Sequence, residues 1–273
     1  MKNVKLIAQA VDIFPGDGKH PYARTGKLDF HHIKRAGATG IILGHSEVNE
    51  SPETVNKKLI AAFNEVLKDN VVLLGESWEE IGKSWSECSD GEKEKVKKVV
   101  QEKLFKILNN VDKEIAQVAI FGYEPGWGVR GSGKEDVPPP GFKQIKALSG
   151  ALRDILAGLY TEEAARRIRI IYGGSSSPER VEEIMPIEDI DGFILGSSGT
   201  ATDWVKKIGD SIITISKSKQ SGRKPVLVLN WKAYLLQESY DDFLKVISTF
   251  DGKLDIYLAP SATDLRELRE KIE

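Results

Sequence analysis

The sequence predicts an α/β protein, a closed (β/α)8 barrel, from three observations. Short runs rich in Val, Ile and Leu recur eight times along the 273 residues. Their apolarity is continuous rather than alternating, as is typical of parallel strands that are covered on both faces. Amphipathic stretches with helical spacing lie between them, and strands that alternate with helices form right-handed βαβ units. Eight such units can close into a barrel.

The predicted elements follow one another in a regular order. The strands are Val4–Val11, Gly40–Gly44, Val71–Glu76, Val118–Tyr123, Ile168–Tyr172, Gly192–Leu195, Val226–Asn230 and Leu254–Ala259. The clearest helices are Pro52–Lys68, Gly91–Asn109, Gly141–Tyr160, Asp203–Ile215 and Ser239–Phe250. The alternative is an open doubly wound sheet, but the Gly-x-Gly-x-x-Gly turn that usually follows its first strand is missing. We therefore expect one barrel domain over residues 1–273.

Composition excludes several classes of protein. The formal net charge is −2 with both signs interspersed, a pattern without the basic footprint of a nucleic-acid-binding protein. No apolar run approaches the roughly 20 residues of a membrane span, and the first residues lack the apolar core of a signal peptide. The single cysteine, Cys88, excludes an internal disulfide, so the expected location is the reducing cytoplasm.

Polar side chains and small turns stand at the carboxyl ends of the predicted strands. They are Gln9, His45, Glu76, Glu124, the turn Gly173-Gly174-Ser175, the pair Gly196-Ser197, Asn230 and Lys232. In a (β/α)8 barrel this end carries the βα loops that build active sites. The sequence therefore predicts one site that these residues share.

Glu124 has the most informative surroundings in this set. It ends an apolar run within the motif Tyr-Glu-Pro-Gly-Trp at 123–127, and the glycine-rich segment 128–133 follows at once. An enzyme presents a desolvated base in this way, with a carboxylate that leaves a buried strand beneath a glycine-rich lid. Imidazole, amide and ammonium groups at the ends of other strands would complete such a site.

Each of these features also has a plainer interpretation. A lone His at a strand end is more often a hydrogen-bonded structural residue than an electrophile, and we interpret His20, His31 and His32 in that way. Tyr-Gly-Gly-Ser can be only a tight turn, and we interpret Glu76 and Trp127 as structural residues. The motifs gain weight together, because they fall on separate strands of one eight-strand pattern.

Four motifs carry a resemblance to a known family: Gly-His-Ser-Glu at 44–47, Tyr-Glu-Pro-Gly-Trp at 123–127, Tyr-Gly-Gly-Ser at 172–175 and Asn-Trp-Lys at 230–232. With them, nearly the whole chain resembles the triosephosphate isomerase family. The order is rotated, since residues 4–209 resemble the family's third to eighth strands and residues 226–273 its first and second. The resemblance thus implies a circularly permuted barrel. The long polar linker 216–225 would join the family's usual termini.

The resemblance implies a role for each catalytic candidate. Glu124 would remove a proton from the carbon next to a carbonyl, and His45 would polarise that carbonyl as a neutral imidazole. Triosephosphate isomerase is itself a known example of such a Glu base and neutral His. Lys232 would stabilise the enediolate, with Asn230 as a second polar contact and Glu47 as the carboxylate that approaches the lysine. The chemistry agrees, because a carboxylate base needs a dry pocket and an enediolate needs fixed donors.

The substrate that the resemblance implies is a small phosphorylated sugar. Backbone N–H groups at Ser175, Gly196 and Ser197 would bind its phosphate, because glycine-rich turns before helices favour anions. Gly131, in the glycine-rich segment, would add another N–H. Neither a metal nor an organic cofactor is expected. The implied reaction interconverts dihydroxyacetone phosphate and D-glyceraldehyde 3-phosphate, a step of glycolysis and gluconeogenesis.

Several positions depart from the family's usual pattern. The segment 127–134 is one residue longer than usual, and Ser197 stands where a second glycine is usual. These departures keep two alternatives open: an isomerase of another small phosphorylated ketose, such as a tetrulose phosphate, and a non-catalytic phosphate-binding barrel. Lys27 and Val48 replace a glutamate and an arginine that could pair with each other, so any homodimer is expected to have an altered interface.

Overall fold

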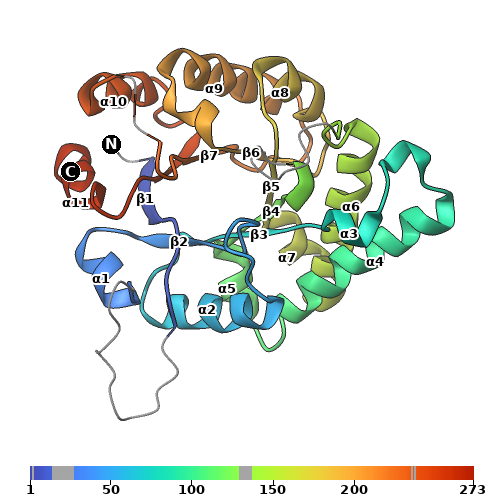
Figure 1. Cartoon of the computed structure of the whole chain (residues 1–273). Coiled ribbons are helices and arrows are strands. Elements are labelled where there is room, and N and C mark those ends of the chain that lie inside the picture. Colours follow the sequence, from blue (N-terminus) through green and yellow to red (C-terminus); the bar gives the residue numbers. More distant parts are fainter. Residues whose placement is uncertain (2, 14–27, 129–136, 235, 237) are drawn as a thin grey trace, which may run out of the picture.

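Eight parallel strands form a closed barrel in the computed structural model, which describes residues 1, 3–13, 28–128, 137–234, 236 and 238–273 (Figure 1). The strands are β1 (Val4–Ala8), β2 (Gly40–Leu43), β3 (Val71–Leu74), β4 (Ile120–Tyr123), β5 (Arg169–Gly173), β6 (Gly192–Leu195), β7 (Val226–Asn230) and β8 (Asp255–Ala259). Each strand pairs with the next, and β8 pairs with β1 in the register Val4↔Ile256. The predicted (β/α)8 barrel is confirmed.

The helices form a ring around the strands (Figure 1). They are α1 (Phe30–Arg35), α2 (Pro52–Asn64), α3 (Trp78–Ile81), α4 (Asp90–Ile107), α5 (Lys113–Val118), α6 (Phe142–Leu159), α7 (Glu162–Arg167), α8 (Pro178–Ile184), α9 (Thr202–Ser216), α10 (Tyr240–Ser248) and α11 (Leu265–Ile272), with 3-10 turns η1 (Trp85–Glu87), η2 (Gly126–Gly128) and η3 (Ser197–Thr200). Ser51, Ser89 and Ser239 each accept a bond from a first-turn N–H, which satisfies a donor that the helix leaves free. None of the described helices is long and apolar enough to cross a membrane.

Some predicted strand bounds were wrong. Val118, expected to start a strand, is the last residue of α5 and is 39% exposed, and β4 begins only at Ile120. At the other end, β1 stops at Ala8 and β3 at Leu74, short of the predicted bounds. Apolar character does not by itself report strand pairing, since Val11 is buried beyond the end of β1 and Val118 is an exposed residue of α5.

Apolar side chains fill two layers. The layer inside the barrel takes residues from all eight strands: Ile7, Ile42, Val71, Leu73, Ile120, Ile171, Ile194, Val226, Val228, Tyr257 and Ala259. A larger cluster lies between the strands and the helices. Each fully buried Val, Leu or Ile side chain contributes about 1.5–3 kcal/mol relative to an exposed one. Because both faces of each strand are covered, the strands are apolar without alternation.

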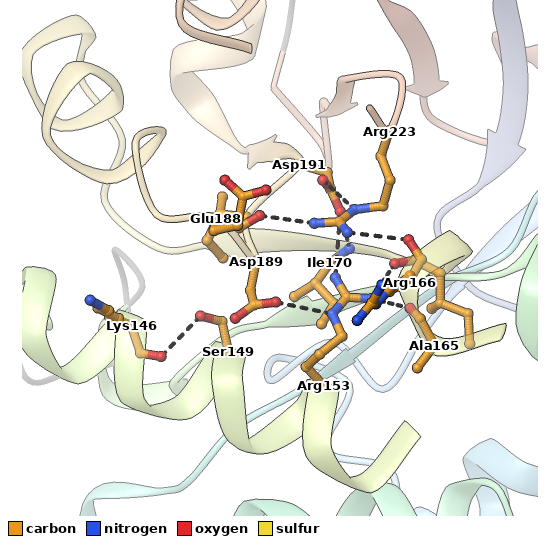
Figure 2. A network of polar contacts seen from close by, with 12 residues as sticks. Lys146, Ser149, Arg153, Ala165, Arg166, Ile170, Glu188, Asp189, Asp191 and Arg223 are labelled. Atoms are coloured by element: carbon orange, nitrogen blue, oxygen red, sulfur yellow. Dashed lines mark hydrogen bonds and ion pairs between the residues drawn. The ribbon is translucent and has the colours of Figure 1, made fainter. Parts of the chain in front are cut away.

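The polar linker at 216–225 is fastened to the base of the barrel. Its first residue ends α9, and the remainder leads into β7. Arg223 donates from Nε to Asp191 Oδ1 at 2.7 Å and from NH2 to the Glu188 carbonyl at 2.8 Å (Figure 2). Arg153 of α6 enters the same network (Figure 2). The linker is therefore held against the residues that directly precede β6.

The ends of the chain meet at the closure between β8 and β1 (Figure 1). The amino group of Met1 donates to the Ile272 carbonyl, at the end of α11, over 2.9 Å. The two ends thus lie side by side, as expected for residues on neighbouring units of the barrel.

Candidate active site

A cavity of about 540 Å³ opens at the carboxyl ends of the strands. The predicted residues that line it are His45, Glu124, Ser175, Gly196, Ser197, Asn230 and Lys232. They end or follow β2, β4, β5, β6 and β7. Residues far apart in the chain meet here because parallel strands of a barrel all end on one face.

Glu124 directly follows β4, where its backbone N–H bonds to the Leu74 carbonyl at 2.8 Å. The residue is only 5% exposed. Its Oε2 accepts a bond from the Ser46 N–H at 3.0 Å, and its Oε1 lies 3.6 Å from Nε2 of His45. The Ser46 N–H orients Oε2 of Glu124, and Oε1 faces the imidazole of His45. Such a buried and oriented carboxylate has the geometry of a general base.

The His45 ring is oriented by its own loop. Its Nδ1 accepts a bond from the Glu47 N–H at 3.1 Å. A nitrogen that accepts from a backbone N–H carries no proton, so the neutral ring holds its proton on Nε2. That nitrogen is the one that faces Glu124. The neutral imidazole can therefore donate a hydrogen bond beside the carboxylate.

Lys232 lies just beyond β7 in an unusual backbone conformation. Its φ is +52°, a left-handed value that few residues other than glycine adopt. Gln9 Nε2 donates to the Lys232 carbonyl at 2.8 Å and to the Ala259 carbonyl at 3.0 Å, and Asn230 Oδ1 accepts from the Lys232 N–H at 3.3 Å. The ammonium group pairs with the Glu47 carboxylate. These contacts hold a cation at the cavity wall in a conformation that the chain alone disfavours.

The turn after β5 brings small residues to the cavity. A Cβ on Gly174 would lie 2.3 Å from the Tyr172 hydroxyl, so only glycine fits there. Ser175 lines the cavity, but its N–H bonds to the Gly128 carbonyl at 3.3 Å. The predicted Ser175 N–H donor is therefore already engaged in this structure.

The turn after β6 lies next to the lysine. A Cβ on Gly196 would come within 3.7 Å of the Lys232 Cε, which places the two residues side by side. Ser197 starts the 3-10 turn η3 and lines the same cavity. A backbone turn beside an ammonium group is a suitable surrounding for an anion.

Other predicted residues lie elsewhere. Gly131, His20 and Lys27 are outside the described residues. His31 and His32 belong to α1 and do not line the cavity. Within the described part of the chain, no group of three or more His, Cys, Asp or Glu side chains is arranged to hold a metal ion.

Glu76 has a set of contacts that its sequence position did not reveal. It is 1% exposed, and its Oε1 accepts from the Tyr123 hydroxyl at 3.0 Å, Trp127 Nε1 at 3.4 Å and Gln144 Nε2 at 2.9 Å. Burial raises the pKa of this carboxyl above its ordinary value, although the hydrogen bonds act against that rise. Glu76 therefore bonds to Tyr123 and Trp127, which lie before and after Glu124 in the chain, and to Gln144 of α6.

The cavity is also lined by residues that were not predicted, among them Arg180, Trp204 and Tyr234. Arg180 lies in the first turn of α8, and Trp204 in that of α9. The only sequence signal for Arg180 is a cation shortly after the Gly-Gly-Ser turn. Which cavity a helical side chain enters depends on the packing of the helix, so this signal was too weak to use.

The fold and the site together define a class of protein. A (β/α)8 barrel with a buried carboxylate, an imidazole and an ammonium on one cavity is typical of enzymes that move a proton on a small anionic substrate. A sequence model of the family described as triosephosphate isomerase matches residues 1–212. The chain belongs to the triosephosphate isomerase family.

Individual relatives agree with this family. The triosephosphate isomerase of Caldanaerobacter subterraneus subsp. tengcongensis is 33% identical over 190 residues, which cover 68% of this chain and 70% of the relative. That of Thermoanaerobacter pseudethanolicus is 33% identical over 211 residues, covering 76% and 77%. That of Malacoplasma penetrans is 33% identical over 201 residues, covering 72% of each.

Proposed function

We propose that the protein interconverts dihydroxyacetone phosphate and D-glyceraldehyde 3-phosphate by proton transfer through an enediolate. The observation that carries this proposal is the buried pair of Glu124 and His45, whose Oε1 and Nε2 atoms are 3.6 Å apart on the cavity wall. A base and a donor this close can act on neighbouring atoms of one substrate. Membership of the triosephosphate isomerase family supports the same reaction.

The steps follow from the positions of these groups. Glu124 takes a proton from the hydroxyl-bearing carbon next to the carbonyl, and the C–H electron pair becomes the double bond of the enediolate. The negative charge moves to the former carbonyl oxygen, where His45 Nε2–H and the Lys232 ammonium stabilise it. A proton then passes from the hydroxyl oxygen to that oxygen. Glu124 returns its proton to the former carbonyl carbon, which yields the aldehyde.

Supporting residues set the electrostatics of this centre. Glu47 pairs with the Lys232 ammonium and supplies the N–H that orients His45. Asn230, 4% exposed, is a second polar contact next to the lysine. Ser46 orients the base through its N–H. Together these groups favour charge that develops on a substrate oxygen, because preorganised donors act strongly away from water.

The substrate phosphate belongs at the turns after β5 and β6. Gly196 and Ser197 lie beside Lys232, and Ser175 lines the same cavity. Backbone N–H groups at such turns favour an anion. The Ser175 N–H would have to leave the Gly128 carbonyl to contribute. Gly131 remains a predicted donor.

A coupled isomerase assay tests the proposal with a matched pair of variants. Glu124→Gln keeps the shape of the side chain but removes the base, so kcat should fall by about 10²- to 10⁴-fold. Glu163→Gln is the control, because Glu163 is exposed on α7 and paired with Arg167. A folded wild-type protein without turnover would contradict the proposal, and so would full activity in Glu124→Gln.

The two alternative functions are distinct outcomes of the same assay. A higher kcat/KM for a tetrulose phosphate than for triose phosphates would indicate an isomerase of another ketose. Phosphate binding without turnover of either sugar would indicate a non-catalytic barrel. Ser197 and the longer segment 127–134 are the sequence features that keep these alternatives open.

We also propose that the strand order is circularly permuted within one barrel domain, with residues 216–225 joining the family's usual termini. The family match ends at residue 212, yet β7 and β8 follow it, complete the barrel and carry Asn230 and Lys232. A reordered chain, with 226–273 placed before residue 1, tests this. It should fold and keep kcat/KM within a few-fold, because the units keep their neighbours. Failure of the reordered chain to fold would contradict the proposal.

A homodimer, if formed, has an interface altered from that of the family. Val48, which stands where the family usually has arginine, is 46% exposed and follows the loop that carries His45 and Glu47. An exposed apolar residue there offers packing instead of an ion pair. Sedimentation of the wild type beside Val48→Asp tests this. A dimer unaffected by the charge would overturn the assignment.

We infer a cytoplasmic location from the free, buried Cys88. Cell fractionation with an alkylation assay tests this. The protein should accompany cytoplasmic markers with its thiol reduced, and recovery from the medium or the membrane fraction would contradict the inference.

A further inference from the structure

Arg180 is a cation on the cavity wall that has no part in the steps described above. It lies in the first turn of α8, where its N–H bonds to the capping hydroxyl of Ser177. Its side chain is 21% exposed and lines the cavity with Ser175 and Ser197. Among the described residues that line this cavity, Arg180 and Lys232 are the Lys and Arg side chains. Of these two cations, Arg180 is the one carried by the helix that follows β5.

The guanidinium group connects α8 to the chain before α6. Its NH2 donates to the Pro140 carbonyl at 2.6 Å. Pro140 is buried and ends the run Pro138-Pro139-Pro140, whose rings fix φ and remove three N–H donors. The stiff segment therefore presents a carbonyl that a side chain can hold at little cost in entropy.

The same proline closes a second contact. A Cβ on Gly128 would lie 3.2 Å from Pro140 Cδ, so the two described ends of the connection from β4 to α6 touch each other. Gly128 in turn accepts a bond from the Ser175 N–H. Ser175 thus fastens one end of this connection to the turn after β5, and Arg180 fastens the other end to α8.

Arg180 also lies close to the underside of that turn. The Tyr172 hydroxyl is buried against Gly174. Burial raises the pKa of Tyr172 to about 12, while the nearby Arg180 charge acts in the opposite direction. Neither this hydroxyl nor Arg180 Nε makes a hydrogen bond of ordinary geometry within the described residues. The guanidinium group therefore lies beside the Tyr172 hydroxyl, against which Gly174 is packed.

We infer that Arg180 is a positioning residue for the phosphate of the substrate. It fastens the Pro140 carbonyl to α8, and it adds positive charge to the wall of the cavity that Ser175 and Ser197 also line. This inference rests on the proposed isomerase function. A purely structural role would rest on the bond to the Pro140 carbonyl and on the ion pair with the exposed Glu183 at 2.9 Å, a pair that contributes little by itself.

The test compares two substrates that differ only in the phosphate. In Arg180→Gln, kcat/KM for glyceraldehyde 3-phosphate should fall about tenfold, mainly through a higher KM, because the positive charge on the cavity wall and the bond to the Pro140 carbonyl are lost. The kcat/KM for unphosphorylated glyceraldehyde should stay within twofold. Arg180→Lys keeps the charge but not the planar donor set, so it should recover part of the loss. Arg167→Gln, at an exposed ion pair on α7, is the control and should change neither substrate.

Three outcomes would overturn the inference. An equal loss on both substrates would indicate a merely structural residue, and so would no loss on the phosphorylated one. If Arg180→Gln does not fold, the same comparison is made with Arg180→Lys, which should lose activity on the phosphorylated substrate alone. Calorimetric titration with inorganic phosphate separates the two proposals. A wild type without turnover would end the isomerase proposal, whereas unchanged phosphate affinity in the Arg180 variants would end this inference.

Discussion

The Glu47 backbone N–H donates to Nδ1 of His45 at 3.1 Å, which leaves Nε2 as the protonated nitrogen of the neutral ring. This bond comes from a residue only two positions further along the chain, so the orientation of the imidazole is built into its own loop. The same loop provides the Ser46 N–H that orients Glu124. One short segment after β2 thus aligns both partners of the proton transfer.

His45→Gln should lower kcat by about 10²- to 10³-fold, the usual cost of losing one donor to a developing oxyanion. KM should change little, because the donor acts mainly on the charged intermediate. Steady-state kinetics with dihydroxyacetone phosphate measures both constants. A kcat within threefold of the wild type would show that the imidazole has no role in the reaction.

Gln9→Leu should lower kcat/KM by about tenfold. The leucine keeps most of the volume but removes both donors to the carbonyls of Lys232 and Ala259. Lys232 would then lose the contacts that hold it at φ +52°. Kinetics and a melting curve are needed together. A large fall in Tm with kcat/KM unchanged would mean that Gln9 supports the barrel and not the lysine.

Glu76→Gln should stabilise the protein more at pH 8 than at pH 5. The folded-state pKa of Glu76 is raised by burial above the ordinary value of 4.5. Above that ordinary value the folded state binds more protons than the unfolded state, so this group reduces stability as pH rises. A neutral amide removes that dependence and still offers an oxygen to Tyr123 and Gln144. Urea denaturation at both pH values measures the difference, with Glu163→Gln as an exposed control. A larger gain at pH 5 would refute the assignment.

Arg223→Met should destabilise the fold by about 3–5 kcal/mol, because it leaves a buried carboxylate without its close partner. Asp191 is 2% exposed, and its other arginine, Arg153, is 3.9 Å away (Figure 2). Activity at low temperature should be unchanged, since the network lies at the amino ends of the strands. Denaturant unfolding beside Arg167→Met measures the cost. A loss below about 1 kcal/mol, as for a surface ion pair, would contradict a stabilising role of the Arg223–Asp191 ion pair.

The sequence by itself determined the barrel and the residues at its functional end. Apolar runs of strand length and amphipathic helices between them specify local structure, and the order of strands then follows from short right-handed connections. Because parallel strands of a barrel end on one face, His45, Glu124, Asn230 and Lys232 had to meet there. The strand bounds predicted at Val118 and Glu76 were wrong, since an apolar run does not by itself show which residues pair.

Only the tertiary structure decided which atoms touch. The Ser175 N–H bond to Gly128, the three bonds to Glu76 and the bond from Arg180 to Pro140 each join residues that are 40 to 68 positions apart in the sequence. Such contacts depend on how barrel closure sets the distance and rotation of each helix and loop. The physical reason is one of range: propensity and periodicity act over a few residues, whereas a hydrogen bond requires two distant groups to be within about 3 Å.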